Sequence, residues 1–537
     1  MDFDAIVVGG GHNGLVCAAY LAKAGLRTVV IEARDTVGGC ASTVDAIGAR
    51  VNICNCDHVS FRTTPVMEEL ALEHHGLRYL DVDPAQLSVP WNGAAPWYLF
   101  HSIERTLDSL RLTHPEEVDG YQRYLKAALP AVELIWELAT RTPTPRHVTE
   151  RVLDRRGAGV RTLLTWSRRS VGAVLTDFFR SEALLAPAVV TGPSVWGLSP
   201  QTPRTGMGAL TYAMKHAGRT GRPVGGSGGV PAALASAITS AGGQLKTSTR
   251  VDTIVLEGGR TKGIRTSDGE IIEAPVVVVA CDPQIAIVEW LKGAPLNARM
   301  QKVQTKWANR PHGDGYESKV DAVIGELPSS RLHELAHGDE LGAEPWTPTT
   351  IVAPSLAELH AAHGLMGHGR IADRPMLYVN IPSAIDETMR PGGTDHLLSL
   401  EVLFTPYALK DGWSGSEEPQ RWLTLLDQLC GPGTSASVKQ WRAMTPPEYE
   451  LQFSMRRGHA ASFPGGPMAA LLGKDRELSR YETPIDGLFL TGAATFPGAG
   501  VWGASGRNTA LVALRHKPRV MGRGFRVPAR NPMRASA

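Results

Sequence analysis

Near the N-terminus, a short apolar run is followed by a helical pattern and then by a second apolar run. Ala5-Ile6-Val7-Val8 predicts a buried strand over residues 4–10, and residues 15–23 predict a helix that Gly25 ends. A second strand is expected over residues 27–33. Strand, helix and strand within about thirty residues predict a βαβ unit with parallel strands.

The turn between this strand and helix carries the pattern Gly9-x-Gly11-x-x-Gly14. Gly9 allows the tight turn, Gly11 has no side chain to block a pyrophosphate, and Gly14 lets the helix pack against the strand. The amides at the helix N-terminus favour phosphate. Glu32, about twenty residues further on, can accept hydrogen bonds from ribose hydroxyls. The unit therefore predicts a dinucleotide site.

Two more glycine-rich segments indicate FAD, because a site for NAD alone does not need them. Residues 33–43 read Ala-Arg-Asp-Thr-Val-Gly-Gly-Cys-Ala-Ser-Thr, in which Gly38 and Gly39 let the backbone approach the diphosphate and flavin. Near the C-terminus, a strand over residues 488–492 enters residues 492–500, which are rich in glycine and alanine, and a last helix follows. Such a turn can bring backbone amides to the flavin ring and ribityl chain.

The pattern along the rest of the chain predicts two lobes. A helix over residues 230–241 is followed by strands over 244–248, 251–257, 261–267, 270–273 and 276–280. Residues 86–221 are largely helical, with helices expected at 121–138 and 171–186. Residues 291–481 are mixed, with strands at 320–324, 377–381 and 397–404. We expect a discontinuous Rossmann-type FAD-binding domain (1–85, 222–290 and 482–516), an α+β substrate-binding lobe (86–221 and 291–481) and a basic, disordered tail (517–537).

With these motifs in view, the sequence resembles the phytoene-desaturase-like flavoproteins. It is most like the branch of the desaturase-type carotenoid ketolases and the animal mitochondrial oxidoreductase related to them. The likeness spans nearly the whole chain and rests on residues 9–21, Cys56-Asp57-His58, Arg222-Pro223-x-Gly225-Gly226, residues 377–392, Tyr481-x-Thr483-Pro484-Ile485 and Gly506-Arg507-Asn508. It implies an α/β fold of the glutathione-reductase and amine-oxidase type.

The motifs and the resemblance together define an expected FAD site. Its residues are Gly9, Gly11, His12, Asn13, Gly14, Glu32, Ala33, Arg34, Gly38, Gly39, Val251, Gly492, Gly500, Gly506 and Asn508. The resemblance implies that Val251 holds the adenine through its backbone. The chain departs from the family at residues 455–464, where only His459 corresponds, and at Trp502, where a smaller residue is usual. The ketolase substrate is therefore not carried over.

Composition limits the other classes of function. Apolar residues make up 43% and charged residues 20% of the 537, and the net charge of +2 argues against a nucleic-acid binder. The chain opens without a targeting segment and has no long apolar run, so we expect a cytoplasmic protein. We predict no metal site: Cys54, Cys56 and His58 lack zinc spacing. His333, His337, His360, His363 and His368 are expected to be solvated.

We expect an FAD-dependent oxidoreductase of the phytoene dehydrogenase type, which moves a hydride from an apolar, polyene or isoprenoid substrate to flavin. His58, His459 and Trp502 are candidates for the substrate face of the flavin, although either histidine can equally be a packing residue. The alternatives are a flavin amine oxidase and a flavoprotein with a regulatory role and no turnover.

Two basic segments suggest weak docking to the inner face of a membrane. Residues 141–169 carry eight arginines interleaved with apolar residues, as in an interfacial amphipathic helix. Residues 515–537 add seven basic residues and no acid. The alternative is a solvated helical face and a disordered tail.

Overall fold

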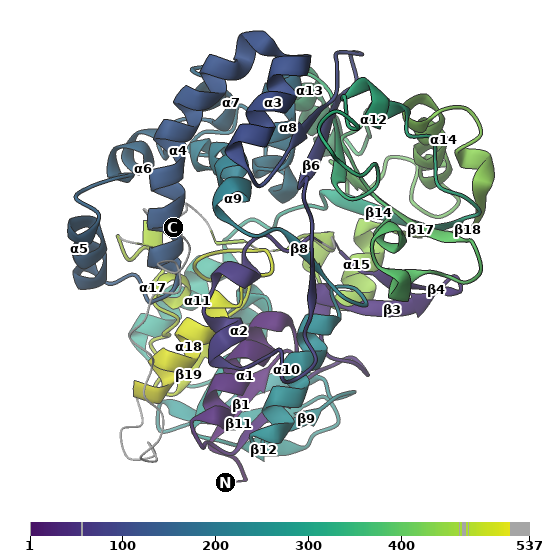
Figure 1. Ribbon diagram of the computed structural model, residues 1–537. Coiled ribbons are helices and arrows are strands. Elements are labelled where there is room, and N and C mark those ends of the chain that lie inside the picture. Colours follow the sequence, from purple (N-terminus) through teal and green to yellow (C-terminus); the bar gives the residue numbers. More distant parts are fainter. Residues whose placement is uncertain (1, 55–56, 461, 464–468, 471, 516–537) are drawn as a thin grey trace.

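The computed structural model describes residues 2–54, 57–460, 462–463, 469–470 and 472–515. Cys56 and the tail at 517–537 lie outside these ranges. Figure 1 shows two lobes, the lower one built on a five-stranded sheet and the upper one on a seven-stranded sheet. Both sheets draw strands from distant parts of the chain.

The five-stranded sheet has the order β19-β13-β1-β2-β9, and all its neighbours are parallel. Its central strands are buried on both faces, which explains their continuous apolar sequences. The strands are β1 (Ala5–Val8), β2 (Thr28–Ile31), β9 (Gln244–Lys246), β13 (Val276–Val279) and β19 (Leu488–Leu490). The βαβ unit and the return of the chain at residues 276 and 488 were predicted from the sequence.

Alternate residues of β1 enter different cores. Val7 packs among residues of α1 (His12–Lys23), α10 (Gly229–Ser240) and α18 (Ala504–Arg515), which cover one face of the sheet. Ile6 and Val8 pack instead towards Ile254 and Ile264 of a small antiparallel sheet. That sheet is formed by β10 (Val251–Glu257), β11 (Arg260–Thr266) and β12 (Ile271–Glu273). The same core includes residues of α11 (Ala298–Ala308).

The seven-stranded sheet has the order β18-β14-β17-β16-β15-β6-β7. Only β15 and β6 run parallel, and the other neighbours are antiparallel. Its strands are β6 (Gln86–Pro90), β7 (Trp97–Leu99), β14 (Glu317–Ile324), β15 (Thr349–Ala353), β16 (Leu377–Asn380), β17 (His396–Leu403) and β18 (Val438–Met444). Two short two-stranded ladders join β3 (Thr43–Ala46) to β4 (Ala49–Asn52) and β5 (Tyr79–Asp81) to β8 (Gly221–Pro223).

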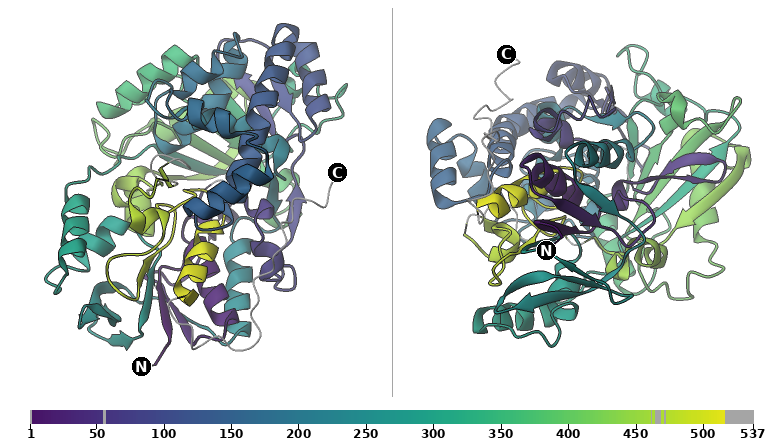
Figure 2. Two further views of the ribbon diagram at one scale, coloured as in Figure 1. Left: turned by 90° about the vertical axis from the view of Figure 1, so that its left-hand side faces the viewer. Right: turned by 90° about the horizontal axis from the view of Figure 1, so that it is seen from below.

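Helices from the middle of the chain pack on one side of this second sheet (Figure 2). They enclose a cluster of buried rings that includes Trp97, Tyr121, Tyr124 and Tyr212. The helices are α3 (Ile103–Thr113), α4 (Val118–Ala139), α5 (Pro145–Asp154), α6 (Val160–Trp166), α7 (Val171–Leu175), α8 (Glu182–Val190), α9 (Thr211–Ala217) and α13 (Leu356–Gly367). The remaining helices are α2 (Val66–Glu69), α12 (Arg331–Leu335), α14 (Glu418–Cys430), α15 (Pro446–Phe453) and α17 (Arg476–Ser479).

Two expected helices are broken in the structure. The helix expected at residues 171–186 is α7 and α8, because Phe179 turns into the ring cluster and the Ser181 side chain caps α8. The single amphipathic helix expected within 141–169 is α5 and α6. They are separated by a turn in which Arg156 has φ +51°, and Trp166 is buried against the core.

His333 also differs from expectation. It is buried rather than solvated, and its ring lies between the Tyr98 hydroxyl at 2.7 Å and Asp339 at 3.1 Å. The helix that carries His333, α12, has only five residues. A helical pattern this short does not reveal that position 333 is buried.

Candidate active site

A cavity of ≈ 1160 Å³ is lined by residues of both lobes. It exceeds the roughly 300–1,000 Å³ of a typical single-ligand pocket. Most of the residues expected from the sequence line it: Gly9, Gly11, His12, Asn13, Gly14, Glu32, Ala33, Arg34, Gly38, Gly39, Val251, Gly492, Gly500, His58, His459 and Trp502. Three glycine-rich segments that are remote in sequence therefore meet at one site.

The first glycine turn has the tight geometry of a phosphate cradle. Gly9 has φ +102°, and a Cβ atom on Gly14 would lie 2.1 Å from the Gly9 carbonyl oxygen. A Cβ atom on Gly11, in contrast, meets nothing within 4 Å, because this residue faces the cavity at the N-terminus of α1. The turn thus leaves open the space that a pyrophosphate needs beside the helix dipole.

Glu32 lies at the end of β2 and is bonded to the backbone of both neighbouring turns. Its Oε2 accepts a hydrogen bond from the Gly10 amide at 2.7 Å, and its Oε1 accepts one from the Arg34 amide at 2.9 Å. A carboxylate has about four acceptor sites, so each oxygen retains capacity for a ribose hydroxyl. The two amides fix the orientation of the carboxylate.

The third glycine segment is joined to the first through His12. Its Nε2 lies 3.1 Å from the Gly500 carbonyl oxygen, and burial lowers the pKa of His12 to about 4. The ring is therefore neutral at pH 7. Next to it, the buried Asn13 has an Oδ1 with no hydrogen-bond partner among the described residues. Such an acceptor is satisfied when a ligand donor occupies the cavity.

The three candidates for the flavin face occupy different settings. His58 is buried, with Nδ1 2.8 Å from the Tyr79 hydroxyl and Nε2 3.2 Å from the Ser227 hydroxyl. Burial, with a smaller effect of His12, lowers the pKa of His58 to about 3. Both of its nitrogens are thus engaged within the protein.

His459 and Trp502 lie on the cavity wall. The His459 ring contacts Tyr316 edge-on at 5.2 Å, and burial lowers the pKa of His459. Trp502 donates from Nε1 to the Ala499 carbonyl at 3.1 Å, which holds the indole over the glycine-rich loop.

A polar wall of the cavity was missed by the sequence analysis. Asp57 accepts a hydrogen bond from Arg222 at 2.6 Å and another from Thr349, and all three residues are largely buried. Lys215 donates to Gln86 at 2.7 Å, and burial lowers the pKa of Lys215 to about 8.

Two glutamates of the seven-stranded sheet, Glu317 and Glu401, line the same cavity. The sequence contains one indication of this acidic wall. Glu401 is the only acid in the apolar run Leu397-Leu398-Ser399-Leu400-Glu401-Val402-Leu403. The rest of the cavity wall beyond the glycine turns is mainly apolar and includes Val195, Trp196, Leu198, Met207, Met214 and Ile351.

Comparison with known proteins agrees with this geometry. Residues 7–68 match the model of an NAD(P)-binding Rossmann-like domain, and residues 101–306 match that of the flavin containing amine oxidoreductases. Over 96% of the chain, the sequence is 27% identical to pyridine nucleotide-disulfide oxidoreductase domain-containing protein 2 of Mus musculus, of which 94% is covered. It is 24% identical to the neurosporene-forming phytoene desaturase of Cereibacter sphaeroides, over 95% of this chain and 94% of that one.

These matches make the chain similar to the FAD-dependent oxidoreductases of the phytoene-desaturase type. Its fold is also that of solved amine oxidases. The structure of cyclohexylamine oxidase from Brevibacterium oxydans aligns with a TM-score of 0.58 at 16% identity, over 96% of this chain and 99% of that one.

The residues of the cavity fit FAD. The open face of Gly11, the free acceptor capacity of Glu32 and the unpartnered Oδ1 of Asn13 all lie along the cavity. The cavity is lined by residues from the end of β2 and from the loop after β19, so these segments could hold an extended dinucleotide. Among the described residues, no group of histidines, cysteines and carboxylates could hold a metal ion.

Two of the expected cofactor residues do not line the cavity. A Cβ atom on Gly506 would lie 2.1 Å from the Asn13 carbonyl oxygen, so this glycine allows α18 to cross α1 closely. The Asn508 side chain donates to the Ala139 carbonyl at 2.9 Å and to the Tyr481 hydroxyl at 3.1 Å. Between them, Arg507 forms a bidentate ion pair with Glu69 at 2.6 and 2.7 Å. This motif joins α18 to α1, α2 and the end of α4 behind the site.

Proposed function

We propose that this protein is an FAD-dependent dehydrogenase that acts on a largely apolar substrate with a polyene or isoprenoid chain. The observation that carries the proposal is the continuation of the cavity. Beyond the glycine turns it enters a chamber lined by Val195, Met207, Met214 and Ile351, with room for a second molecule beside the cofactor. A related phytoene desaturase acts on a polyene, which supports the same class of substrate.

Bound FAD supplies the redox chemistry by accepting a hydride from the substrate. The protein's own task is to position the substrate, exclude water and hold the surrounding charges. Trp502 forms part of the wall between the glycine-rich loop and the chamber, and we propose that it orients the reacting carbon chain. His459 is our candidate for proton transfer, since its ring lies on the cavity wall and burial lowers its pKa. His58 is better explained as a packing residue, because Tyr79 and Ser227 occupy its nitrogens.

The alternatives are a flavin amine oxidase and a regulatory flavoprotein without turnover. The family model that matches residues 101–306 is that of the flavin containing amine oxidoreductases, and this name favours the amine oxidase. The large apolar share of the chamber favours a long hydrocarbon over a small amine.

An anaerobic experiment distinguishes these three functions. The purified holoprotein is mixed separately with a polyene hydrocarbon, an isoprenoid alcohol and a small primary amine. We expect bleaching of the oxidised flavin band with an isoprenoid substrate. Bleaching by the amine alone would establish the oxidase, and no bleaching by any compound of the panel would contradict turnover.

The division of the chain is part of the same proposal: residues 1–85, 222–290 and 482–516 bind FAD, and residues 86–221 and 291–481 bind substrate. We also propose a cytoplasmic location with weak docking to an anionic membrane. No described helix is long and apolar enough to span a bilayer.

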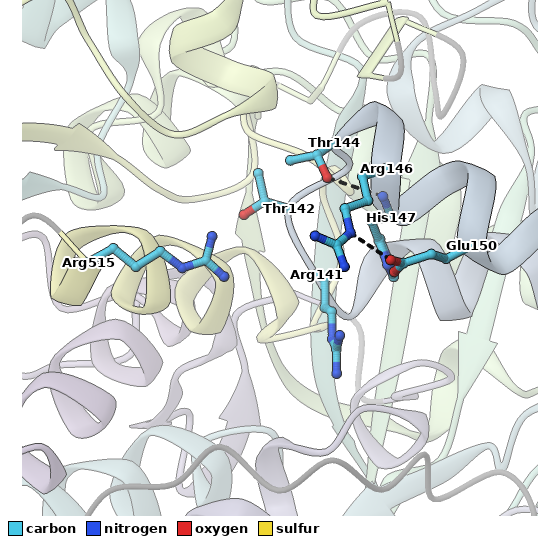
Figure 3. Close-up of a pocket in the computed structure, with 7 residues that line it drawn as sticks. All are labelled: Arg141, Thr142, Thr144, Arg146, His147, Glu150 and Arg515. Atoms are coloured by element: carbon cyan, nitrogen blue, oxygen red, sulfur yellow. Dashed lines mark hydrogen bonds and ion pairs between the residues drawn. The ribbon is translucent and has the colours of Figure 1, made fainter.

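Figure 3 shows Arg141, Arg146 and Arg515 among the residues that line a second pocket. The volume of this pocket is ≈ 340 Å³. Arg141 precedes α5, Arg146 lies in its first turn, and Arg515 ends α18. Glu150 pairs with Arg146 at 2.8 Å. In α5 and α6, Leu153 and Leu164 are exposed at 69% and 38%. Exposed arginines beside exposed leucines are the composition of an interfacial surface.

A further inference from the structure

The far wall of the cavity contains two carboxyl groups that the proposed hydride transfer does not use. Glu317 begins β14, and Glu401 lies in the middle of β17. The register pairs Lys319 with Glu401 and Glu317 with Leu403, so the two glutamates are diagonal neighbours on one face of the sheet. That face also carries Tyr378, opposite Glu401 on β16, and it forms the cavity wall.

Neither glutamate has the partner that a buried carboxylate requires. Glu401 is only 5% exposed, and its Oε1 has no hydrogen-bond partner in the part of the chain that the structure describes. Oε1 of Glu317 is in the same condition. No ion pair reaches either residue among these described positions. An unsatisfied buried carboxyl is costly, so its retention on a cavity wall points to a ligand that completes it.

The cations nearby are already taken. Lys319 is fully buried and donates to Asp321 and to the Asn52 carbonyl, the latter at 2.8 Å. Arg442 donates to the other oxygen of Asp321 at 3.0 and 3.1 Å. Asp321 thus binds both positive charges of this strand face. In the next cluster, Arg222 is bonded to Asp57.

The electrostatic setting agrees with this geometry. Burial raises the pKa of both glutamates, and the charge of Glu317 raises that of Glu401 further. Lys319 acts in the opposite direction on both, while Asp321 and Asp57 add to the rise at Glu401. The phenols of Tyr378 and Tyr449 and the thiol of Cys54 also face the pair. A raised pKa means that these carboxyls take up a proton more readily than an exposed glutamate does, while their oxygens remain hydrogen-bond acceptors.

We propose that Glu317 and Glu401 bind a hydrogen-bond-donating group, a hydroxyl or a protonated amine, at one end of an otherwise apolar substrate. A pure hydrocarbon in this chamber would cover both carboxyls and satisfy neither. A substrate with a donor end satisfies them and is held in one orientation, with its chain along the apolar wall. This inference rests on the proposed function, because it specifies the substrate of the same chamber.

Three probes with the same isoprenoid chain test the site: farnesol, farnesylamine and farnesene. Binding to the holoprotein is followed by the change in the flavin absorbance spectrum. We expect the alcohol or the amine to bind at least about tenfold more tightly than the hydrocarbon, as expected for one hydrogen bond to a carboxylate. The tighter of the two identifies the donor. In Glu401→Leu and in Glu317→Leu the preference should fall to within about twofold.

The melting temperature of the holoprotein without substrate gives a second test. Replacing a carboxyl that stabilises the fold would lower this temperature. Glu401→Gln should leave the melting temperature unchanged or raise it, because it removes an unsatisfied acid. The matched control is Asp321→Asn, which should lower the melting temperature, since it leaves Lys319 and Arg442 without their carboxylate.

Several results would overturn the proposal. These are equal affinity for all three probes, binding of none of them, a preference that survives both leucine variants, or a fall in melting temperature in Glu401→Gln as large as in the control. Loss of FAD from Glu401→Gln would assign the carboxyl to the cofactor instead. A donor preference without flavin reduction would refute the proposed dehydrogenation and leave the site standing. If farnesene and farnesol both reduced the flavin and bound with equal affinity, the proposed dehydrogenation would stand and the carboxyl site would be refuted.

Discussion

Gly506 of α18 lies directly on the backbone of Asn13 in α1. A Cβ atom at position 506 would lie 2.1 Å from the Asn13 carbonyl oxygen and 3.0 Å from the Cys17 amide nitrogen. Backbone cannot yield as a flexible side chain does, so Gly506→Ala must push α18 away from α1. We expect a loss of about 1–3 kcal/mol in the free energy of unfolding, as for other overpacked positions. Because Asn13 lines the FAD cavity, FAD should also bind less tightly.

Gly364→Ala is the control for this change. Gly364 is a helical glycine with no atom within 4 Å of its Cβ position, so alanine should be neutral or slightly stabilising. Urea unfolding and the flavin-to-protein absorbance ratio measure both variants. Equal unfolding curves would show that the two helices are not in close contact at Gly506.

A side chain at position 11 should abolish FAD binding but leave the apoprotein folded. Its Cβ position is open, so valine fits the fold but projects into the space expected for the pyrophosphate. Gly11→Val should therefore yield a folded, colourless protein, while Gly364→Val remains yellow. Flavin content after gel filtration and far-UV circular dichroism distinguish the outcomes. A yellow Gly11→Val protein would show that the diphosphate does not bind at this turn.

Glu32 tests whether the cofactor carries an adenosine ribose. The wild-type protein should release FAD, not FMN, on denaturation. Glu32→Ala should weaken FAD binding by about 1.5–3 kcal/mol, the cost of losing hydrogen bonds to a charged group. Fluorescence titration of the apoprotein with FAD and with FMN measures this. The expectation fails if FMN binds as well as FAD, or if Glu32→Ala leaves the FAD affinity unchanged.

Three histidines with lowered pKa values should make the folded state sensitive to acid. Burial lowers the pKa of His12 and of His216 to about 4, and burial with His12 lowers that of His58 to about 3. The unfolded chain takes up these protons near pH 6.5, whereas the folded chain does not. Stability is therefore fully present above pH 6.5 and falls as the pH drops towards 4. Each histidine contributes up to about 1.4 kcal/mol per pH unit in this window.

Urea unfolding between pH 7 and pH 4.5 measures this slope. His58→Gln should be less stable at pH 7, because the contacts to Tyr79 and Ser227 are altered, and should show a shallower fall in acid. An unchanged slope in the variant would mean that His58 is protonated in the folded protein.

The parts of the fold that follow from local sequence were predictable. The β-branched runs at β1 and β13 and the glycine turn before α1 each indicate their structure within a few residues. The break between α7 and α8 was not predictable from periodicity, because it depends on Phe179 packing against distant rings. The glycine motifs likewise indicated residues that line the cavity. The pair Glu317 and Glu401 could not be found, since only the register of β14 on β17 brings the two residues together.

Docking to a membrane should depend on the unpaired arginines between α4 and α7. Four of the eight arginines at 141–169 pair with acids: Arg146, Arg151, Arg155 and Arg169. Arg156 and Arg161 are exposed, and no ion pair engages them within the described ranges. Each basic residue near an anionic surface contributes about 1 kcal/mol. Arg156→Glu with Arg161→Glu should therefore lower the fraction of protein that floats with anionic vesicles at low salt.

The matched control for this double variant makes the same charge change on another helix. Arg299 and Lys302 are exposed on α11, so Arg299→Glu with Lys302→Glu alters the net charge equally and leaves α5 and α6 intact. If the two double variants float alike, net charge governs association and the arginine surface has no special role. If the wild-type protein itself stays at the bottom of the gradient, peripheral docking is wrong. A substrate dissolved in the bilayer is then less well supported, because the chamber would have to be loaded from solution.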